Sequence, residues 1–451
     1  MSQLRFRSER LAGWGRFPVE PCHLYRPEKR SDVAAILASN NSPSYVARGL
    51  GRSYGDAALN RDAGVISQLR LNHFLGFDAQ AGALECESGV SFAEIIEYFL
   101  PRGFFLPVTP GTKFVTVGGA IAADVHGKNH HRDGTIANFV TDLRLLTASG
   151  CILTCSPNEN TDVFWATVGG MGLTGVILSA RLKLRRVEAA YVQASYQKAR
   201  SFGEALDAMA ESDSRYRYSV AWLDCVARGR EFGRAVLIGG NHVTAEEVPA
   251  RLGDPLELPR RTRRRVPLDL PAWALSRSVA SAFNALYYRR RRASGLVDLD
   301  RFFYPLDAVA DWNRLYGKRG FVQYQVALPE DEGREALAKL LRRLADSPAP
   351  PFLAVLKRFG EGNPGLLSFP MKGYTLAVDT SMTRDVIRFL HGLDAVALDC
   401  GGRVYLAKDA VMRPETFAAS YPRLEEFRVV KARLDPKGAL SSSLARRLKI
   451  C

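Results

Sequence analysis

The chain has 451 residues, of which 47% are hydrophobic and 24% are charged. This composition is typical of a globular protein and excludes a disordered or fibrous chain. Lys and Arg outnumber Asp and Glu by 15, and residues 260–293, with ten Arg and one Asp, contribute most of this excess.

Seven Cys are scattered along the chain without a CxxC pair, which predicts reduced thiols rather than a disulfide framework. Residues 1–13 are charged and do not have the pattern of a signal peptide. The longest charge-free run, residues 163–180, contains four Gly and is not expected to span a membrane. We therefore predict a cytoplasmic protein.

Residues 1–190 alternate short helices, strands and glycine loops, without the regular alternation of a doubly wound sheet. Ser31 is expected to cap a helix that runs to Ala38, and Ser91 with Glu94 to form a capping box. Further along, helices are predicted at 202–211 and 334–344, strands at 44–47, 142–148, 176–184, 322–328 and 376–379, and a mainly helical pattern over 405–451. This pattern predicts an α+β fold.

A glycine-rich loop, ARGLGRSYGD from Ala47 to Asp56, follows the first of these strands. Its backbone N–H groups, with Arg52 and Ser53, could form a nest for a diphosphate, and a purely structural turn is the alternative. A second run, GMGLTG at 170–175, matches GxGxxG but precedes a strand instead of following one. We therefore do not interpret it as a Rossmann motif.

Small apolar residues at 110–112 and 116–123 allow a flat ring or a phosphate to pack against the backbone. They lead into DVHGKNHH at 124–131, where three of the seven His fall within six residues. No Glu or Cys accompanies these His at helical spacing, so a polar wall of an active site is favoured over zinc, and no metal is expected.

The basic segment, residues 255–295, has Arg clusters at 260–265 and 289–292 around the apolar and aromatic stretch 273–288. This order suits an anionic membrane surface, with guanidinium groups on lipid phosphates. A solvated loop is the alternative. Nucleic-acid binding is not expected, because no recognised module surrounds the segment.

Together, these motifs resemble the vanillyl-alcohol-oxidase-type FAD oxidoreductases and, within them, the branch that oxidises polyprenylphosphoryl ribose. ARGLGRSYGD, VTVGGAIAADVHGKNHH, FWATVGGMGLTGVI, FVQYQ, LLSFP and RVYLAKD carry the resemblance, which covers nearly the whole chain. It implies a two-lobed FAD-binding domain at 1–190, an inserted α+β substrate domain at 191–404, and a C-terminal segment at 405–451 that completes the FAD domain. It also implies non-covalent FAD.

By motif position, the resemblance assigns cofactor contacts to the two glycine-rich regions and to a few later residues. These are Ala47, Arg48, Gly49, Leu50, Gly51, Arg52, Ser53, Tyr54, Gly55, Asp56, Ala57, Gly111, Thr116, Val117, Gly118, Gly119, Ala123, Asp124, Val125, His126, Val176, Ile177 and Tyr405. Substrate contacts are assigned to Lys128, Trp222, Gln323, Gln325, Lys357, Ala377 and Lys408, and catalytic roles to Lys408, His126 and Lys128.

Oxidation of a secondary alcohol needs a hydride acceptor and a base, and Lys408 could be the base if burial lowers its pKa. Lys128 and Lys357 could instead hold a phosphate, and Trp222 could belong only to the core. The chain departs from the family at Ala377, where GYTLAVD replaces a cysteine-containing pattern, and at 302–305, where FFYP replaces FYHP. Covalent inhibitors directed at that thiol should therefore lack their target.

The expected reaction is oxidation of the 2′-hydroxyl of a polyprenylphosphoryl-β-D-ribose to a ketone. A separate NAD(P)H-dependent reductase would complete epimerisation to the arabinose form used in cell-wall polysaccharides. The expected location is the inner face of the plasma membrane. One alternative is the same flavin chemistry on a soluble sugar, alditol or aldonolactone. Another is a non-catalytic membrane- or nucleic-acid-binding protein that retains the fold.

Overall fold

The computed structural model describes residues 5–290 and 293–451. Its N-terminal lobe contains a four-stranded sheet in the order β1 (Arg7–Ala12), β2 (Val19–Tyr25), β4 (Gly64–Ser67) and β3 (Tyr45–Arg48), with helix α1 (Arg30–Ala38). The predicted end at Ala38 is confirmed, but the predicted cap at Ser31 is wrong: the helix begins at Arg30 and Lys29 is its cap, two residues earlier, because the Asp32 carboxylate accepts from the backbone N–H of Lys29.

A second lobe contains an antiparallel five-stranded sheet. Its order is β5 (Phe74–Asp78), β6 (Ala83–Glu87), β10 (Val176–Lys183), β8 (Val140–Leu146) and β9 (Ile152–Cys155), with helices α2 (Phe92–Phe99), α3 (Val117–Ala122), α4 (His130–Asp133) and α5 (Thr161–Thr167). The predicted capping box of Ser91 and Glu94 is confirmed at the start of α2. The predicted strands at 142–148 and 176–184 are confirmed as β8 and β10, within two residues at each end.

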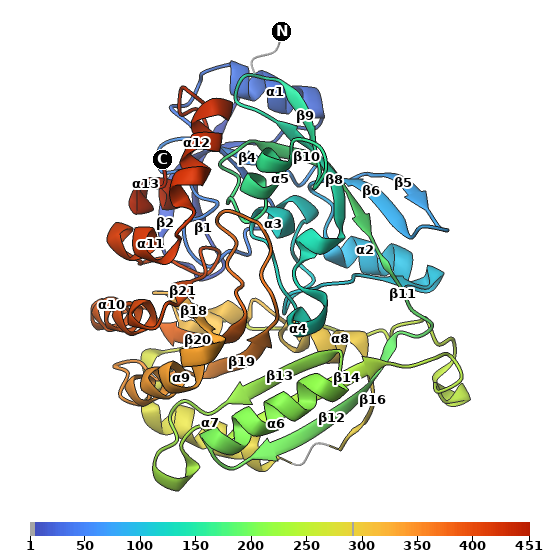
Figure 1. Ribbon diagram of the computed structural model, residues 1–451, viewed down its shortest axis with the longest axis vertical. Helices are drawn as coiled ribbons and strands as arrows, with labels where there is room; N and C mark the ends of the chain where they lie inside the picture. The colour runs from blue at the N-terminus through green and yellow to red at the C-terminus, as the bar shows by residue number, and fades with distance from the viewer. Residues whose placement is uncertain (1–4, 291–292) are drawn as a thin grey trace.

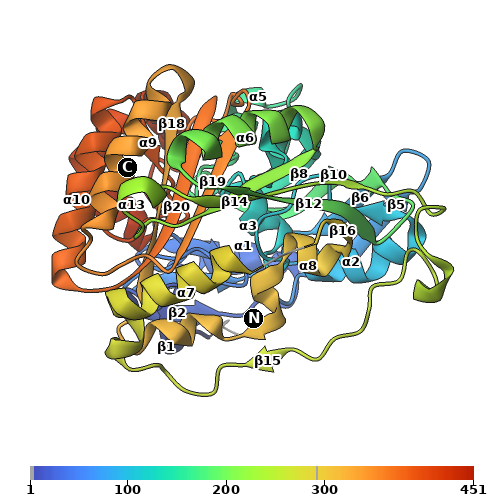
Figure 2. The same ribbon diagram turned by 90° about the horizontal axis from the view of Figure 1, so that it is seen from below.

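The middle of the chain forms an eight-stranded antiparallel sheet (Figure 1). Its order is β16 (Gly295–Asp298), β12 (Tyr191–Ala199), β14 (Ala235–His242), β13 (Tyr218–Leu223), β19 (Leu353–Phe359), β20 (Gly373–Ser381), β18 (Phe321–Pro329) and β21 (Arg403–Val404). Helices α6 (Phe202–Arg215) and α9 (Glu330–Ala345) pack on one face, with α10 (Arg384–Asp399) against α9. Helix α7 (Arg277–Arg289) lies on the opposite side of β12–β14 from α6 (Figure 2).

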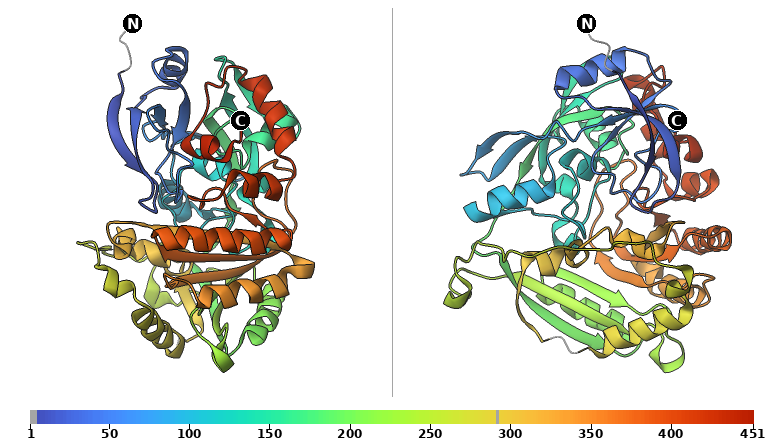
Figure 3. Two further views of the ribbon diagram at one scale, coloured as in Figure 1. Left: turned by 90° about the vertical axis from the view of Figure 1, so that its left-hand side faces the viewer. Right: turned by 180° about the vertical axis from the view of Figure 1, so that it is seen from behind.

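After β21 the chain returns to the N-terminal lobes as α11 (Pro414–Ser420), α12 (Leu424–Leu434) and α13 (Ser443–Leu448) (Figure 3). Leu440 forms a parallel bridge with Tyr45 beside β3, and the N–H of Ser443 donates to the carbonyl oxygen of Leu59. One hydrophobic core extends through the second lobe, the eight-stranded sheet and the C-terminal helices. The predicted α+β class is confirmed. No helix within the described residues is long and apolar enough to cross a membrane.

Candidate active site

A cavity of about 310 Å³ lies between the two N-terminal lobes and the eight-stranded sheet. Most residues predicted from the sequence line it. They are Ala47, Arg48, Gly49, Leu50, Gly51, Arg52, Ser53, Tyr54, Ala57, Gly111, Thr116, Gly118, Gly119, Ala123, Val125, His126, Ile177, Gln323, Gln325, Lys357, Ala377, Tyr405 and Lys408. The fold thus brings together segments as far apart in the chain as Trp14 and Lys408.

The glycine loop after β3 is tightly packed on one side and open on the other. A Cβ at Gly55 would collide with the carbonyl oxygen of Asp409, so this position requires glycine. By contrast, nothing lies within 4 Å of the Cβ position at Gly111, in the facing wall. The Arg52 guanidinium lies 4.0 Å from the ring centre of Trp14, and its Nε has no hydrogen-bond partner among the described residues. A partly buried cation therefore borders the open side of the loop.

His126, after the small-residue run, is enclosed. Gln325 on β18 donates from Nε2 to His126 Nε2 over 3.0 Å, which leaves the ring proton on Nδ1. Within the described part of the chain, Nδ1 is buried and has no partner. Burial, followed by the charge of Lys357, lowers the pKa of His126 well below its usual range. His126 is therefore a neutral ring with one unused donor at the cavity wall.

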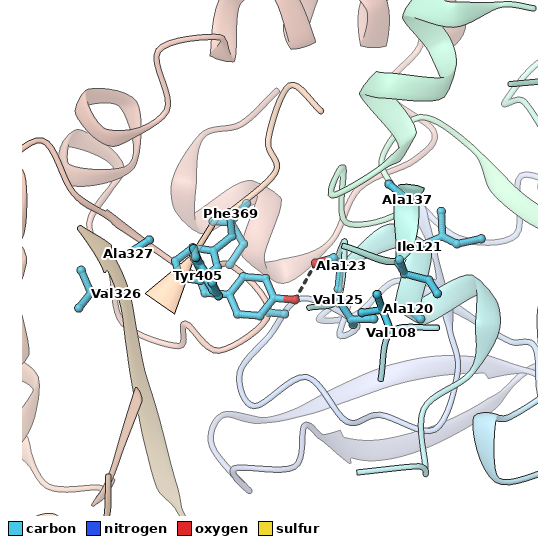
Figure 4. Packing of buried hydrophobic residues seen from close by; sticks show 14 of the residues in the cluster. Val108, Ala120, Ile121, Ala123, Val125, Ala137, Val326, Ala327, Phe369 and Tyr405 are labelled. Atoms are coloured by element: carbon cyan, nitrogen blue, oxygen red, sulfur yellow. Dashed lines mark hydrogen bonds between the residues drawn. The ribbon is translucent and has the colours of Figure 1, made fainter. Parts of the chain in front are cut away.

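Tyr405 holds the C-terminal segment against α3. Its hydroxyl donates to the carbonyl oxygen of Ala123 over 2.6 Å, and its ring stacks on Phe369 at 4.5 Å between centroids (Figure 4). Burial raises the pKa of Tyr405 well above its usual range, so this donor stays protonated. The loop that carries Lys408 is thereby fixed beside the small-residue run.

Lys408 lies over the Tyr54 ring, with Nζ 3.8 Å from the ring centre. Burial lowers its pKa, although the nearby Asp379 carboxylate acts in the opposite direction. Asp379 on β20 has no exposed surface. Its Oδ1 accepts from Gln323 Nε2, its Oδ2 has no partner in the described structure, and burial raises its pKa. An amine and a carboxylic acid whose pKa values are shifted toward each other can exchange a proton at neutral pH.

Lys357 lies near this pair, and Lys128 lies near Lys357. Lys357 on β19 lines the cavity, and burial lowers its pKa to about 8. Lys128 does not reach the cavity wall, because its Nζ donates to the carbonyl oxygen of Phe302 and lies 4.7 Å from the Phe302 ring centre. Burial and the charge of Lys357 lower the pKa of Lys128 to about 7. Lys357 is therefore mostly charged at neutral pH and gives the cavity a cationic group suited to an anion.

Seven residues assigned from the sequence do not line the cavity: Gly55, Asp56, Val117, Asp124, Lys128, Val176 and Trp222. Val117 and Val176 are fully buried in hydrophobic clusters. The Asp124 carboxylate instead accepts hydrogen bonds from Ser368 and Asn363. Trp222 is covered by the ring of Tyr287 on α7, at 4.5 Å between centroids. Asp56 pairs with Arg447 on α13, behind the glycine loop.

Comparison with known proteins fits this geometry. The FAD binding domain family matches residues 21–156, and the D-arabinono-1,4-lactone oxidase family matches residues 316–448. The decaprenylphosphoryl-beta-D-ribose oxidase of Mycolicibacterium smegmatis is 37% identical over 98% of both chains. The chain belongs to the decaprenylphosphoryl-β-D-ribose oxidase family. It is a FAD-dependent oxidoreductase, as the sequence predicted.

Two other relatives are less similar or cover less of the chain. A protein encoded in the mprA 5′ region of Streptomyces coelicolor is 36% identical over 80% of this chain and all of its own length. The L-gulono-1,4-lactone dehydrogenase of Mycobacterium tuberculosis is 23% identical over 96% of this chain and 98% of its own. The predicted family and cofactor are therefore confirmed, and members of the wider group act on small lactones.

The residues around the cavity fit FAD. The free space in front of Gly111 can accept a flat ring, the open side of the glycine loop carries the unpaired Arg52 N–H for a phosphate, and His126 offers an unused donor. Asp379 and Arg447 were not predicted from the sequence. Asp379 could have been found, because Gln323 was expected to face the pocket and the GYTLAVD strand carries an acid. No local signal marked Arg447.

Proposed function

We propose that this enzyme oxidises the 2′-hydroxyl of a polyprenylphosphoryl-β-D-ribose to the 2′-ketone. One observation carries the proposal: two half-buried lysines, Lys408 and Lys357, line one cavity. Among the described residues, the buried carboxylate of Asp379 lies near Lys408, and no carboxylate acts on Lys357 in this way. An amine next to a carboxylate, such as that of Lys408, suits proton transfer. An amine without a neighbouring carboxylate, such as that of Lys357, suits binding of a phosphate. The M. smegmatis relative, by its name, acts on a substrate of this kind.

FAD, when bound non-covalently, supplies the hydride acceptor for the C2 hydrogen. We assign the pyrophosphate to the loop 47–57, with Arg52 as its cation. The flavin ring is assigned to Gly111, Gly118 and Gly119 and to the segment from Ala123 to His126. Ile177 and Tyr405 would complete this wall. Gly55, Asp56, Val117, Asp124 and Val176 would then support these contacts from behind.

Lys408 would accept the hydroxyl proton. Burial favours its neutral form, so the amine is a competent base near neutral pH. When Lys408 takes the proton, an ionised Asp379 stabilises the new ammonium group. Gln323, which donates to Asp379 Oδ1 and also to the Tyr54 hydroxyl, would hold the acid in place.

Lys357 would bind the phosphate of the substrate. Lys128 is expected to act less directly, by fixing Phe302 through its carbonyl oxygen. Gln325 orients His126, and Ala377 lies opposite Gln325 in the strand pair β18–β20, so both shape the space for the sugar. Trp222 would not touch the substrate itself. It would act only at the lipid end of the substrate, by supporting the ring of Tyr287.

The ketone must then be reduced from the other face of the ring to give the arabino configuration. We therefore propose a separate NAD(P)H-dependent reductase as the functional partner. The prenyl chain places the reaction at a membrane, and all seven cysteines are unpaired, which favours the cytoplasmic face.

The test is anaerobic reduction of the holoenzyme, followed by its visible flavin absorbance. Farnesylphosphoryl-β-D-ribose should bleach the flavin band, and L-gulono-1,4-lactone should not. Borodeuteride reduction of the product should place deuterium at C2 and yield arabinose together with ribose. Bleaching by the lactone alone, or deuterium at C3, would overturn the proposal.

A further inference from the structure

Helix α7 turns an apolar stripe toward solvent. Val279, Phe283 and Leu286 follow helical spacing and are 37%, 47% and 71% exposed, whereas Ala280 and Asn284 are buried. An amphipathic helix on a globular protein normally turns its apolar stripe toward the core. Here a polar residue, Asn284, faces inward and the apolar stripe faces outward.

A buried polar network fixes this orientation. Asn284 Nδ2 donates to Asp224 Oδ1 over 2.8 Å, and the other oxygen of Asp224 pairs with Arg234 at 2.8 Å. Tyr287 on the same inward face packs on Trp222. Rotating α7 to hide its stripe would leave a buried carboxylate without its amide donor, which is costly. The exposed stripe is therefore a stable feature of the fold.

The segment of the chain next to α7 adds apolar side chains to the stripe and also carries positive charge. Trp273 lies in the short turn Ala272–Leu275 directly before α7 and is 72% exposed, and Leu268 is 71% exposed. Exposed arginines come before and after it in the chain: Arg264 and Arg265 lie in the extended segment 259–271, here called the strap, where Arg265 pairs with Asp311, and Arg289 lies at the end of α7. Figure 2 shows the strap and α7 on one side of the molecule. Large exposed apolar side chains ringed by cations match an anionic bilayer.

The stripe lies on the same side of the eight-stranded sheet as the cavity. Trp222 and Val355 are directly opposite each other in the β13–β19 pair, so their side chains share a face. Val355 lines the cavity, and Trp222 packs against Tyr287 on α7. Phe352, one residue before β19, contacts Phe283 of the stripe. A prenyl chain that leaves the cavity past Val355 would therefore arrive at α7.

We propose that the α7 surface, formed by Leu268, Trp273, Val279, Phe283 and Leu286 with the flanking arginines, docks on an anionic lipid bilayer and delivers the membrane-borne substrate to the cavity. The proposal rests on the proposed function for the identity of the substrate. The occupant is an anionic lipid surface, because the segment that carries the stripe, residues 260–293, has ten Arg and one Asp.

The test uses the full-length holoenzyme with both Trp273→Ser and Leu286→Ser, and vesicles of phosphatidylglycerol and phosphatidylcholine. Val429→Ser on α12 is the matched control, because Val429 is 72% exposed and lies outside the surface. We expect the double variant to bind anionic vesicles roughly 100-fold more weakly than wild type, from the apolar area that stays in water. The control should bind normally. Equal binding of wild type and double variant, or equal loss in the control, would overturn the proposal.

Two further measurements separate the possible outcomes. The double variant should oxidise dispersed farnesylphosphoryl ribose as fast as wild type but lose turnover of a decaprenyl substrate held in vesicles. If wild type oxidises neither substrate, the proposed function fails, whatever the vesicles show. If the double variant changes a dimer into a monomer and still binds vesicles, the surface is a contact between copies of the chain and the lipid proposal is wrong.

Discussion

Arg447 joins the two loops that build the active site, and its replacement tests how the C-terminal helix supports them. Its guanidinium makes two bonds to Asp56, of 2.7 and 2.8 Å, and one of 2.8 Å to Asp409. Asp56 belongs to the glycine loop, and Asp409 follows Lys408. Both carboxylates are buried, whereas Arg447 is 24% exposed.

Arg447→Met removes the cation and leaves both carboxylates in place. Asp409 keeps the backbone N–H groups of Val411 and Met412, so most of the cost falls on Asp56. Breaking a buried ion pair by removing one partner costs about 3–5 kcal/mol. At about 2.1 cal/mol/K per residue, a chain of 451 residues that unfolds in one step has an unfolding entropy of about 0.9 kcal/mol/K. The melting temperature should therefore fall by about 3–5 °C.

The loss should depend on pH. Burial already raises the pKa of Asp56, and Arg447 opposes that rise. In the variant, the pKa of Asp56 rises further, so the folded protein binds a proton that the unfolded chain releases. The deficit is then largest at pH values above the raised pKa and shrinks as acidification neutralises Asp56. Thermal unfolding at pH 5 and pH 8, followed by flavin fluorescence, measures this difference.

Arg433→Met is the matched control, because Arg433 pairs with Asp162 on the surface, where both side chains are more than half exposed. An exposed ion pair contributes about 0–1 kcal/mol to the free energy of unfolding. The melting temperature of Arg433→Met should therefore fall by about 1 °C or less. Arg447→Lys keeps a positive charge but loses the two-pronged hydrogen bonding of the guanidinium group. Its melting temperature should therefore lie between those of wild type and Arg447→Met. The reasoning is refuted if Arg447→Met has the same melting temperature as the Arg433→Met control. It is also refuted if the loss of melting temperature relative to wild type is the same at pH 5 and pH 8.

Three more predictions concern the cavity. Lys408→Met should slow flavin reduction by the substrate by about 10²- to 10⁴-fold and keep FAD bound; normal reduction kinetics in a stopped-flow trace would exclude it as the base. Lys357 has a pKa of about 8 and is charged below that value, so KM for the phosphorylated substrate should rise above pH 8; a Lys357→Met enzyme should lack that rise, and an unchanged profile would contradict the assignment. Gly111→Ala meets nothing within 4 Å, so the apoprotein should melt normally while the Kd for FAD increases; unchanged FAD titrations would show that the ring lies elsewhere.

The sequence determined which segments form the cavity wall. ARGLGRSYGD is one unbroken stretch of chain, and so is the run 116–126. Each of these two stretches builds its own part of the cavity wall. Alternation along β18 also placed Gln323 and Gln325 on one face, because side chains two residues apart in a strand point the same way. The capping box at Ser91 is local for the same reason, since its partners lie three residues apart.

The tertiary structure decided which side chains face one another. Asp379 meets Gln323 only through the pairing of β18 with β20, across 56 positions, and Arg447 meets Asp56 across 391. Lys128 and Trp222 carried the right chemistry for the substrate, but Phe302 and Tyr287 cover them. The stretch 273–288 was predicted from the sequence to suit a membrane surface, but the tertiary bond between Asn284 and Asp224 decides which side chains of α7 face outward. Such pairings depend on strand register and helix rotation, which are set by contacts between distant segments and not by the local pattern of residues.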